Sequence, residues 1–98
     1  MNEYMVTITF PVEFDDEFIS LIPPQRAMVN ELMGKGIITS YSLSASRQTL
    51  WVTMVTKSEE HVLATLQQMP LFRFMDSDVR ELMFHNTPVF APPTFSLN

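Results

Sequence analysis

Four side chains in this sequence have the chemistry to bind a small molecule. Arg26 carries a permanent positive charge that can hold a carboxylate or an enolate, although a guanidinium is not a practical base. Tyr41 and Trp51 each join a large apolar ring to one polar atom, which suits the wall of a pocket. His85 can move a proton, because an unshifted imidazole titrates near neutral pH. We expect these four residues to form a ligand-binding site.

Each of the four also has a purely structural interpretation. On a helix surface Arg26 is a solvated side chain, and at the end of a strand His85 is a rim residue. Tyr41 and Trp51 are equally suited to the core of a dimer. The two aromatic residues can line a pocket and also belong to the dimer core if the pocket lies at the interface between two copies. The residues alone therefore identify no catalytic base.

Several other chemistries are excluded or disfavoured. Cysteine is absent, which excludes disulfides, thiolate metal sites and cysteine nucleophiles. His61 and His85 lie far apart and lack the spacing of metal ligands. With only two glycines, the chain has no glycine-rich phosphate loop. Asp15, Asp16 and Glu17 are typical of a helix cap rather than of a catalytic carboxylate pair. We expect neither a metal nor a cofactor.

Length and composition predict one small domain with excess apolar surface. The chain has 98 residues, so we expect one domain over residues 1–86 and an extended C-terminal arm over residues 87–98. The net charge of −5 (6 − 11) disfavours a nucleic-acid partner. No apolar run approaches the roughly 18 residues of a membrane span and no targeting segment is visible, so we expect a cytoplasmic protein without a membrane partner.

The spacing of apolar residues predicts alternating strands and helices. Strands are predicted at residues 4–10, 37–44, 49–56 and 79–85. Helices are predicted at residues 15–22, from Pro24 to the glycines at 34 and 36, and from Ser58 to Pro70. Pro23 and Pro24 are expected to divide the first helical region, because proline removes a hydrogen-bond donor and clashes with the preceding turn.

This order is β-α-β-β-α-β, which is typical of a ferredoxin-like α+β fold with one antiparallel sheet and both helices on one face. In the second strand we place Ile37, Tyr41 and Leu43 on one face and Ile38 on the other.

The sheet face away from the helices is predicted to be too apolar for water. It carries Met5, Trp51 and Val55 among serines and threonines. Only 17% of the residues are charged, and the chain contains eight Met and eight Phe. An exposed apolar patch costs roughly 25 cal/mol per Å². We therefore expect a homodimer that packs sheet against sheet, and an arm with two Phe residues that contacts a neighbouring subunit.

Three segments carry a resemblance to a known family. The most specific is Gln68–Asp76, with the run Pro-Leu-Phe-Arg-Phe-Met-Asp leading into Val79. Phe10–Asp15 and Lys35–Ile37 are the other two. Over about residues 4–85 the sequence resembles the muconolactone delta-isomerases.

The resemblance implies a dimeric α+β barrel that assembles further into rings of dimers. It implies enzymes that shift a ring double bond in a lactone of the β-ketoadipate pathway of aromatic catabolism, without a cofactor. Such a reaction needs a base and a group that stabilises an enolate. In the family, an acid and a lysine early in the first long helix are associated with this role. The matching stretch here, Ile22–Ala27, carries neither, and Arg26 is its one charge.

Two functions remain as expectations. The first is a cofactor-independent isomerase acting on a small anionic lactone or related cyclic metabolite held between the sheet and the helices. The alternative is a non-catalytic oligomeric ligand-binding or assembly module with a degenerate active site, which Pro23 and Pro24 favour. A walled cavity with Arg26 and a neighbouring acid or histidine would support the first. A filled interior would support the second.

Overall fold

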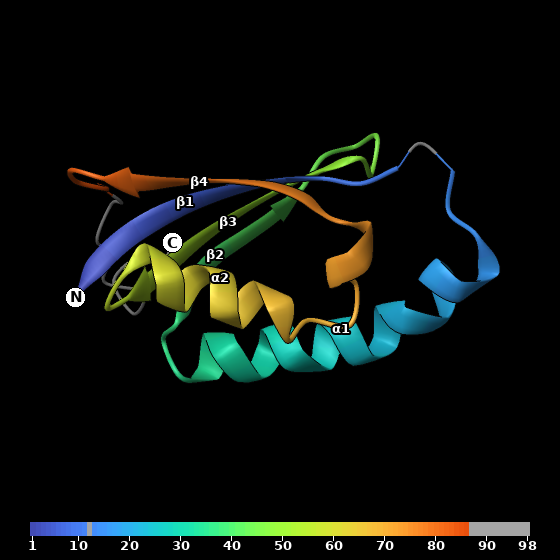
Figure 1. Ribbon diagram of the computed structural model, residues 1–98, viewed down its shortest axis with the longest axis horizontal. Helices are drawn as coiled ribbons and strands as arrows, with labels where there is room; N and C mark the ends of the chain where they lie inside the picture. The colour runs from blue at the N-terminus through green and yellow to red at the C-terminus, as the bar shows by residue number, and fades with distance from the viewer. Residues whose placement is uncertain (12, 87–98) are drawn as a thin grey trace, which may run out of the picture.

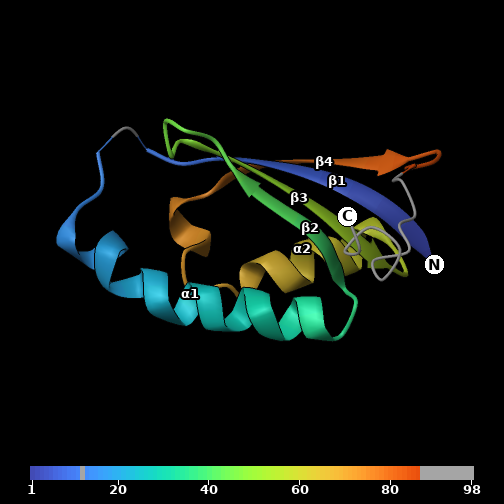
Figure 2. The ribbon, with the colours of Figure 1, turned by 180° about the vertical axis from the view of Figure 1, so that it is seen from behind.

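A single antiparallel sheet covered on one face by two helices forms the protein. The computed structural model describes residues 1–11 and 13–86. The elements are β1 (Asn2–Thr9), α1 (Asp16–Gly34), β2 (Ile38–Leu43), β3 (Thr49–Thr56), α2 (Glu59–Gln67), the short 3-10 helix η1 (Phe72–Phe74) and β4 (Asp76–Leu82). Figure 1 shows α1 and α2 side by side beneath the sheet, and Figure 2 shows the same layers from behind. The predicted α+β arrangement is confirmed.

The strand order β2-β3-β1-β4 places the third and first strands at the centre of the sheet. β1 pairs with β3 so that Val6 lies opposite Val52, and with β4 so that Val6 also lies opposite Val79. Alternate residues face the helices, and these include Val6, Ile8 and Val52, which are fully buried. The core therefore lies between the sheet and the helices.

α1 is one continuous helix, so the predicted break at the two prolines is wrong. Pro23 and Pro24 both lie inside it. The two prolines and the residues one turn before them, Ile19 and Ser20, are exposed, so water can reach the carbonyl groups that lose a donor. Buried residues on both sides of the prolines anchor the two halves of α1 to the same core.

The second strand also differs from the predicted alternation. Ile38 pairs with Met54 and is buried, whereas Tyr41 pairs with Val52 on the same face. The register shifts between Ile38 and Ser40, where a bulge adds a residue to β2. The extra residue changes the parity of the strand, so Ile38 joins Tyr41 on the helix-facing side. The sequence pattern alone contains no sign of this bulge.

The predicted caps are confirmed, and the last strand begins earlier than expected. The Asp15 carboxylate accepts the Phe18 N–H at 2.8 Å, and the Ser58 hydroxyl caps α2. β4 runs over Asp76–Leu82 rather than over residues 79–85. The C-terminal arm predicted at residues 87–98 lies outside the described residues.

Candidate functional site

A cavity lies between α1 and the edge strand β2. Its volume is about 280 Å³ and five residues line it, namely Arg26, Val29, Asn30, Met33 and Tyr41. Four of them recur at helical spacing along one side of α1, while Tyr41 comes from β2. Because β2 is an edge strand, this side of the core is closed by no further strand. The cavity is the space where the helix overhangs the sheet edge.

The cavity brings together two of the four residues singled out in the sequence. Arg26 supplies a guanidinium and Tyr41 a phenol, and Val29 and Met33 supply apolar wall. Arg26 is exposed, whereas Val29 is buried and Tyr41 is half-buried. The charged group therefore stands at the solvent side with the exposed Met33, whereas Val29 forms the deeper part of the wall. This arrangement suits a small ligand with an anionic end and a less polar body.

The electrostatic environment keeps Tyr41 protonated at neutral pH. Burial raises the pKa of the Tyr41 hydroxyl above its usual value. The Gln25 amide and the positive charge of Arg26 lower the pKa, and burial outweighs them. Tyr41 is therefore a hydrogen-bond donor and not a base under ordinary conditions.

Gln25 is the buried neighbour of Arg26 in α1. Its side chain is only 2% exposed, in the middle of α1. The Gln25 Oε1 atom accepts the backbone N–H of Leu71 at 3.1 Å, and the Nε2 atom contacts the Met69 Sδ atom at 3.4 Å. These bonds connect α1 to the segment that joins α2 to η1. A buried amide that meets its partners in this way holds its orientation firmly.

Trp51 and His85 do not line this cavity. Trp51 lies opposite Thr7 and Ser42 on the sheet face away from the helices, and it is 42% exposed. His85 follows the end of β4 and is exposed. The side chains predicted to form one site therefore occupy three separate regions. Only Arg26 and Tyr41 share a cavity.

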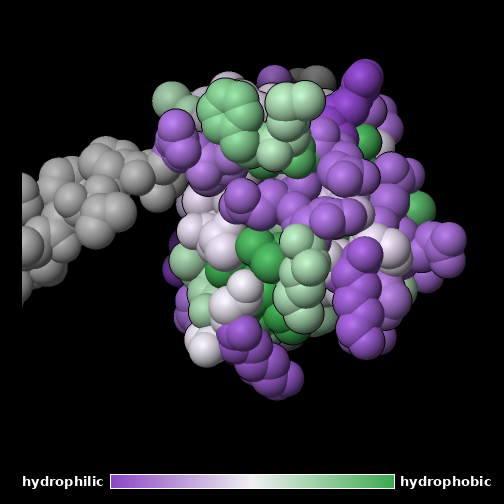
Figure 3. Space-filling view, turned by 90° about the vertical axis from the view of Figure 1, so that its left-hand side faces the viewer, coloured by the Kyte–Doolittle hydropathy of each residue, from purple (hydrophilic) through white to green (hydrophobic). Residues whose placement is uncertain are grey.

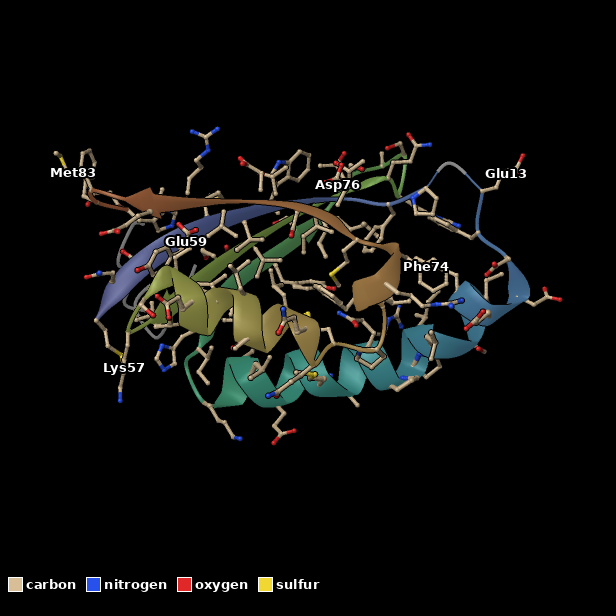
Figure 4. The ribbon with its side chains drawn as sticks, in the orientation of Figure 1. Glu13, Lys57, Glu59, Phe74, Asp76 and Met83 are labelled. Atoms are coloured by element: carbon tan, nitrogen blue, oxygen red, sulfur yellow. The ribbon has the colours of Figure 1, made fainter. Side chains whose placement is uncertain are left out.

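A second hollow lies at the opposite end of the sheet. It has a volume of about 430 Å³ and is lined by Thr9, Phe10, Pro11, Arg73, Phe74, Met75 and Asp76. Arg73 forms an ion pair with Glu17 and lies 4.6 Å from the centre of the Phe74 ring. Figure 4 shows Phe74 next to the first turns of α1, where its ring meets that of Phe18 edge to face at 5.1 Å. With its cation already paired, this hollow offers a ligand less charge than the first.

The chemistry of the α1–β2 cavity is recognition of a hydrogen-bond acceptor. Arg26 and Tyr41 both donate, and none of the five lining residues is a carboxylate or an imidazole. Within residues 1–11 and 13–86, no group of three or more His, Asp or Glu side chains is placed to hold a metal ion. The described helices also include none that is long and apolar enough to cross a membrane.

The fold and this cavity define a small α+β domain with a cavity beside its sheet that is lined by the polar side chains of Arg26, Asn30 and Tyr41. The family model of muconolactone delta-isomerase matches residues 3–87. A crystal structure of muconolactone isomerase superimposes with a TM-score of 0.71 at 24% sequence identity, and the match covers 91% of this chain and 96% of that one. No match was found among curated proteins. The chain belongs to the muconolactone delta-isomerase family.

Sequence reasoning missed Gln25, the buried polar residue next to Arg26. The buried positions of α1 are Phe18, Gln25, Val29 and Leu32, so Gln25 interrupts an otherwise apolar stripe. A polar residue in such a stripe predicts a buried hydrogen-bonding role. That signal is visible only when residues 16–34 are treated as one helix, which the two prolines argued against.

Proposed function

We propose that this protein binds a small anionic lactone, or a related cyclic metabolite, in the α1–β2 cavity. Arg26 pairs with the carboxylate of the ligand, and the Tyr41 hydroxyl donates a hydrogen bond to its carbonyl oxygen. Val29 and Met33 contact the ring. The pairing of a guanidinium with a protonated phenol around one cavity is the observation that carries this proposal.

The same two donors suit the double-bond shift that the family name describes. Removing a proton from the carbon next to a carbonyl places negative charge on the carbonyl oxygen. Arg26 and Tyr41 would stabilise that charge where it develops. None of the five lining residues is a base at neutral pH, so the proton acceptor comes from outside this wall. The reaction would need no cofactor, because both groups belong to the chain.

A second candidate function is a non-catalytic oligomeric module that binds a ligand or serves assembly. Two observations favour it. The cavity wall contains no carboxylate or imidazole, and Trp51 is exposed on the uncovered sheet face, where Met5 and Val55 also lie. Packing of this face against a second copy would bury all three residues. In this candidate the fold is kept for association and the catalytic step is absent.

Ligand binding tests the first proposal directly. Muconolactone, uncharged lactones of similar size and simple dicarboxylates are titrated while the melting temperature is measured. We expect carboxylated lactones to raise it. Arg26→Gln should weaken binding about ten- to hundredfold, because a charge-assisted hydrogen bond is lost. Arg80→Gln removes an equally positive side chain from the other face of the sheet, next to Met5, and should leave the affinity for lactones unchanged.

Turnover separates the two candidate functions. The double-bond shift is followed by absorbance with the wild-type protein and with Arg26→Gln. Turnover that falls in the variant supports an isomerase, whereas binding without turnover supports the non-catalytic module. If the wild-type protein neither binds nor converts any compound of the series, the proposed ligand class is wrong.

A further inference from the structure

We propose that the outer edge of β4 is an interaction surface for a second copy of this chain, which pairs with it antiparallel and places Val79 on the two-fold axis. In this arrangement Met83 and Phe84 of each copy reach the second hollow of the other. The proposed lactone site lies at the opposite edge of the sheet, beside β2, so the inference does not depend on it.

β4 is a regular edge strand. The strand order β2-β3-β1-β4 places it at one margin of the sheet, and within residues 1–11 and 13–86 no strand pairs with its outer side. Its seven residues, Asp76–Leu82, pair with β1 without a register shift. The other edge strand, β2, carries a bulge between Ile38 and Ser40, which disturbs further pairing. β4 therefore presents the regular row of backbone groups to which a further strand can bind.

The side chains of β4 are self-complementary in one antiparallel register. With Val79 opposite itself, Arg80 lies opposite the partner's Asp78, and by symmetry the reverse pair also forms. Arg80 and Asp78 already form an exposed ion pair at 3.0 Å within one strand, so two copies would combine two positive and two negative charges. On the other face Ser77 lies opposite the partner's Glu81, to which a hydroxyl can donate. Such facing pairs stabilise two adjacent strands.

Neighbouring registers place like charges opposite each other. An axis on Asp78 or on Arg80 would set that residue against its own copy. An axis half a residue beyond Val79 sets Asp78 opposite Glu81, and an axis half a residue before it sets Asp76 opposite Glu81. Like charges on facing residues destabilise a strand pair. Among these registers, the charges therefore select the one centred on Val79.

Exposed apolar residues lie at one end of β4 and an apolar hollow lies at the other. Met83 and Phe84 directly follow the strand, and both are exposed. The second hollow lies at the start of the strand, where Phe74 and Met75 line it together with the buried Phe10. Within one chain these two regions are separated by the length of the strand. The exposed residues therefore need a partner to reach such a hollow.

The antiparallel register brings these two regions together. Figure 4 shows Met83 at one end of β4 and Asp76 and Phe74 at the other. Because the partner strand runs in the opposite direction, Leu82 lies opposite the partner's Asp76, and the residues that follow Leu82 reach the residues that precede Asp76. Met83 and Phe84 then contact the partner's hollow, where a thioether and an aromatic ring pack well against other aromatic rings. One register therefore satisfies both the charges and the apolar ends.

This contact is small, because it consists of one pair of seven-residue strands and two apolar ends. We expect it to bury less than the roughly 1,600 Å² of a standard interface. The association is therefore weak, and it forms at higher protein concentration than the packing of two sheet faces.

Cysteine cross-linking tests the register. The chain has no cysteine, so an introduced thiol can pair only with its own copy. In Val79→Cys the two residues face each other across the axis, where Cα atoms lie about 4.5–5.5 Å apart and a disulfide can form. The matched control is Ser77→Cys, on the same strand and face, because its two copies would lie about 13 Å apart along the strands.

We expect mild oxidation at high protein concentration to convert Val79→Cys into a covalent dimer and to leave Ser77→Cys monomeric. Non-reducing gel electrophoresis measures both. If Val79→Cys gives no dimer, or if the control gives as much, the proposed pairing is wrong.

Reversal of charge tests the facing pairs. The measurement is sedimentation equilibrium in a Trp51→Glu background, in which packing through the uncovered sheet face is weakened. Asp78→Arg should weaken the remaining association about tenfold, because like charges then face each other twice in the symmetric contact. Adding Arg80→Asp should restore it, because the exchanged charges are again complementary. A purely local effect of either charge predicts no restoration, and that result would overturn the inference.

The apolar ends provide the last measurement in the same background. Phe84→Ser should weaken association about tenfold, because the ring no longer fills the partner's hollow. Leu43→Ser, which changes an exposed apolar residue at the end of the other edge strand, is the matched control and should have no effect. Circular dichroism verifies the fold of each variant. Equal effects of the two substitutions, or a background protein that stays monomeric at high concentration, would refute the proposed contact.

Discussion

The two faces of the sheet use alternate residues of the same strands, yet they have different properties. On β3, Val52 faces the helices and is fully buried, whereas its neighbour Trp51 faces away and is 42% exposed. The helix-covered face is continuous apolar core, and the uncovered face mixes hydroxyl groups with Met5, Trp51 and Val55. The difference teaches that one strand can contribute to a closed core and to a partly apolar exposed face at once, because successive side chains point to opposite sides.

Hydroxyl groups on the uncovered face satisfy one another. The Thr53 hydroxyl lies 2.8 Å from that of Thr39 and 2.5 Å from that of Ser40. Thr53 is only 1% exposed although it lies on the face without helices. The bulge in β2 brings the two partners together over Thr53. This part of the uncovered face is therefore compatible with burial against another surface, since its polar atoms already have partners.

The end of the sheet near the N-terminus is a further apolar region. Met83 and Phe84 directly follow β4 and are 97% and 72% exposed. Figure 3 looks onto this end of the molecule and shows apolar side chains at the top, a band of polar side chains below them and a second group of apolar side chains lower down. Unlike Trp51, these residues lie beyond the last hydrogen-bonded pair of the sheet. The apolar surface of the uncovered face therefore continues to this end of the sheet.

The largest expected effect on stability comes from removing buried side-chain atoms on the helix-covered face of the sheet. Val52→Ala should lower the free energy of unfolding by about 2–3 kcal/mol, because it removes buried methyl groups and leaves a cavity. Val55→Ala removes the same atoms from the uncovered face and should cost less than about 1 kcal/mol in the single chain. Urea denaturation at concentrations where sedimentation shows a single chain measures both. Equal losses would contradict the contrast between the faces.

The second prediction concerns association through the uncovered face. We expect the wild-type protein to form a homodimer and Trp51→Glu to weaken it at least about a hundredfold, because a charge would be desolvated at the centre of the interface. Leu63→Glu, on the solvent side of α2, is the matched control and should leave the dimer intact. Sedimentation equilibrium measures both dissociation constants. A wild-type chain that stays monomeric at high concentration would remove the role assigned to this face.

The smallest expected effect is the pH dependence of stability caused by Tyr41, which lies on the edge strand β2 and faces the helices. Burial raises the pKa of Tyr41, so the folded state keeps the proton at pH values where the unfolded chain has lost it. The resulting stability is fully present below the unfolded pKa of about 10 and is lost as pH rises through the higher folded value. The free energy of unfolding should therefore fall more steeply above pH 10 in the wild type than in Tyr41→Phe. Denaturation curves at pH 7–11 measure the difference, and parallel pH profiles would refute it.

Local signals predicted most of the fold. Alternation of apolar residues placed β3 at Thr49–Thr56, where the structure has it, and Asp15 and Ser58 marked the two helix starts. The apolar side chains of the uncovered face followed from the same alternation. Each of these features depends on neighbours within one turn or one strand. Nearby residues therefore carry enough information to specify them.

Two of the four residues predicted to bind a ligand share a cavity. Arg26 and Tyr41 were chosen for their chemistry, and the structure places them around one cavity. Trp51 and His85 were chosen for the same reason and lie elsewhere, because residue type carries no information about which sheet face or strand end a side chain occupies. Gln25 was missed because its significance depends on a continuous helix through Pro23 and Pro24.

By itself the sequence determined the order of the elements, the caps, the antiparallel α+β architecture and the apolar character of the uncovered sheet face. Only the tertiary structure decided that α1 continues through two prolines, that a bulge turns Ile38 toward the core, and that Gln25 reaches Met69 and Leu71. The physical reason is the range of the interactions. Caps and alternation arise between close neighbours, whereas the continuity of a helix with two prolines and the partners of a buried amide depend on contacts between segments that are distant in the chain.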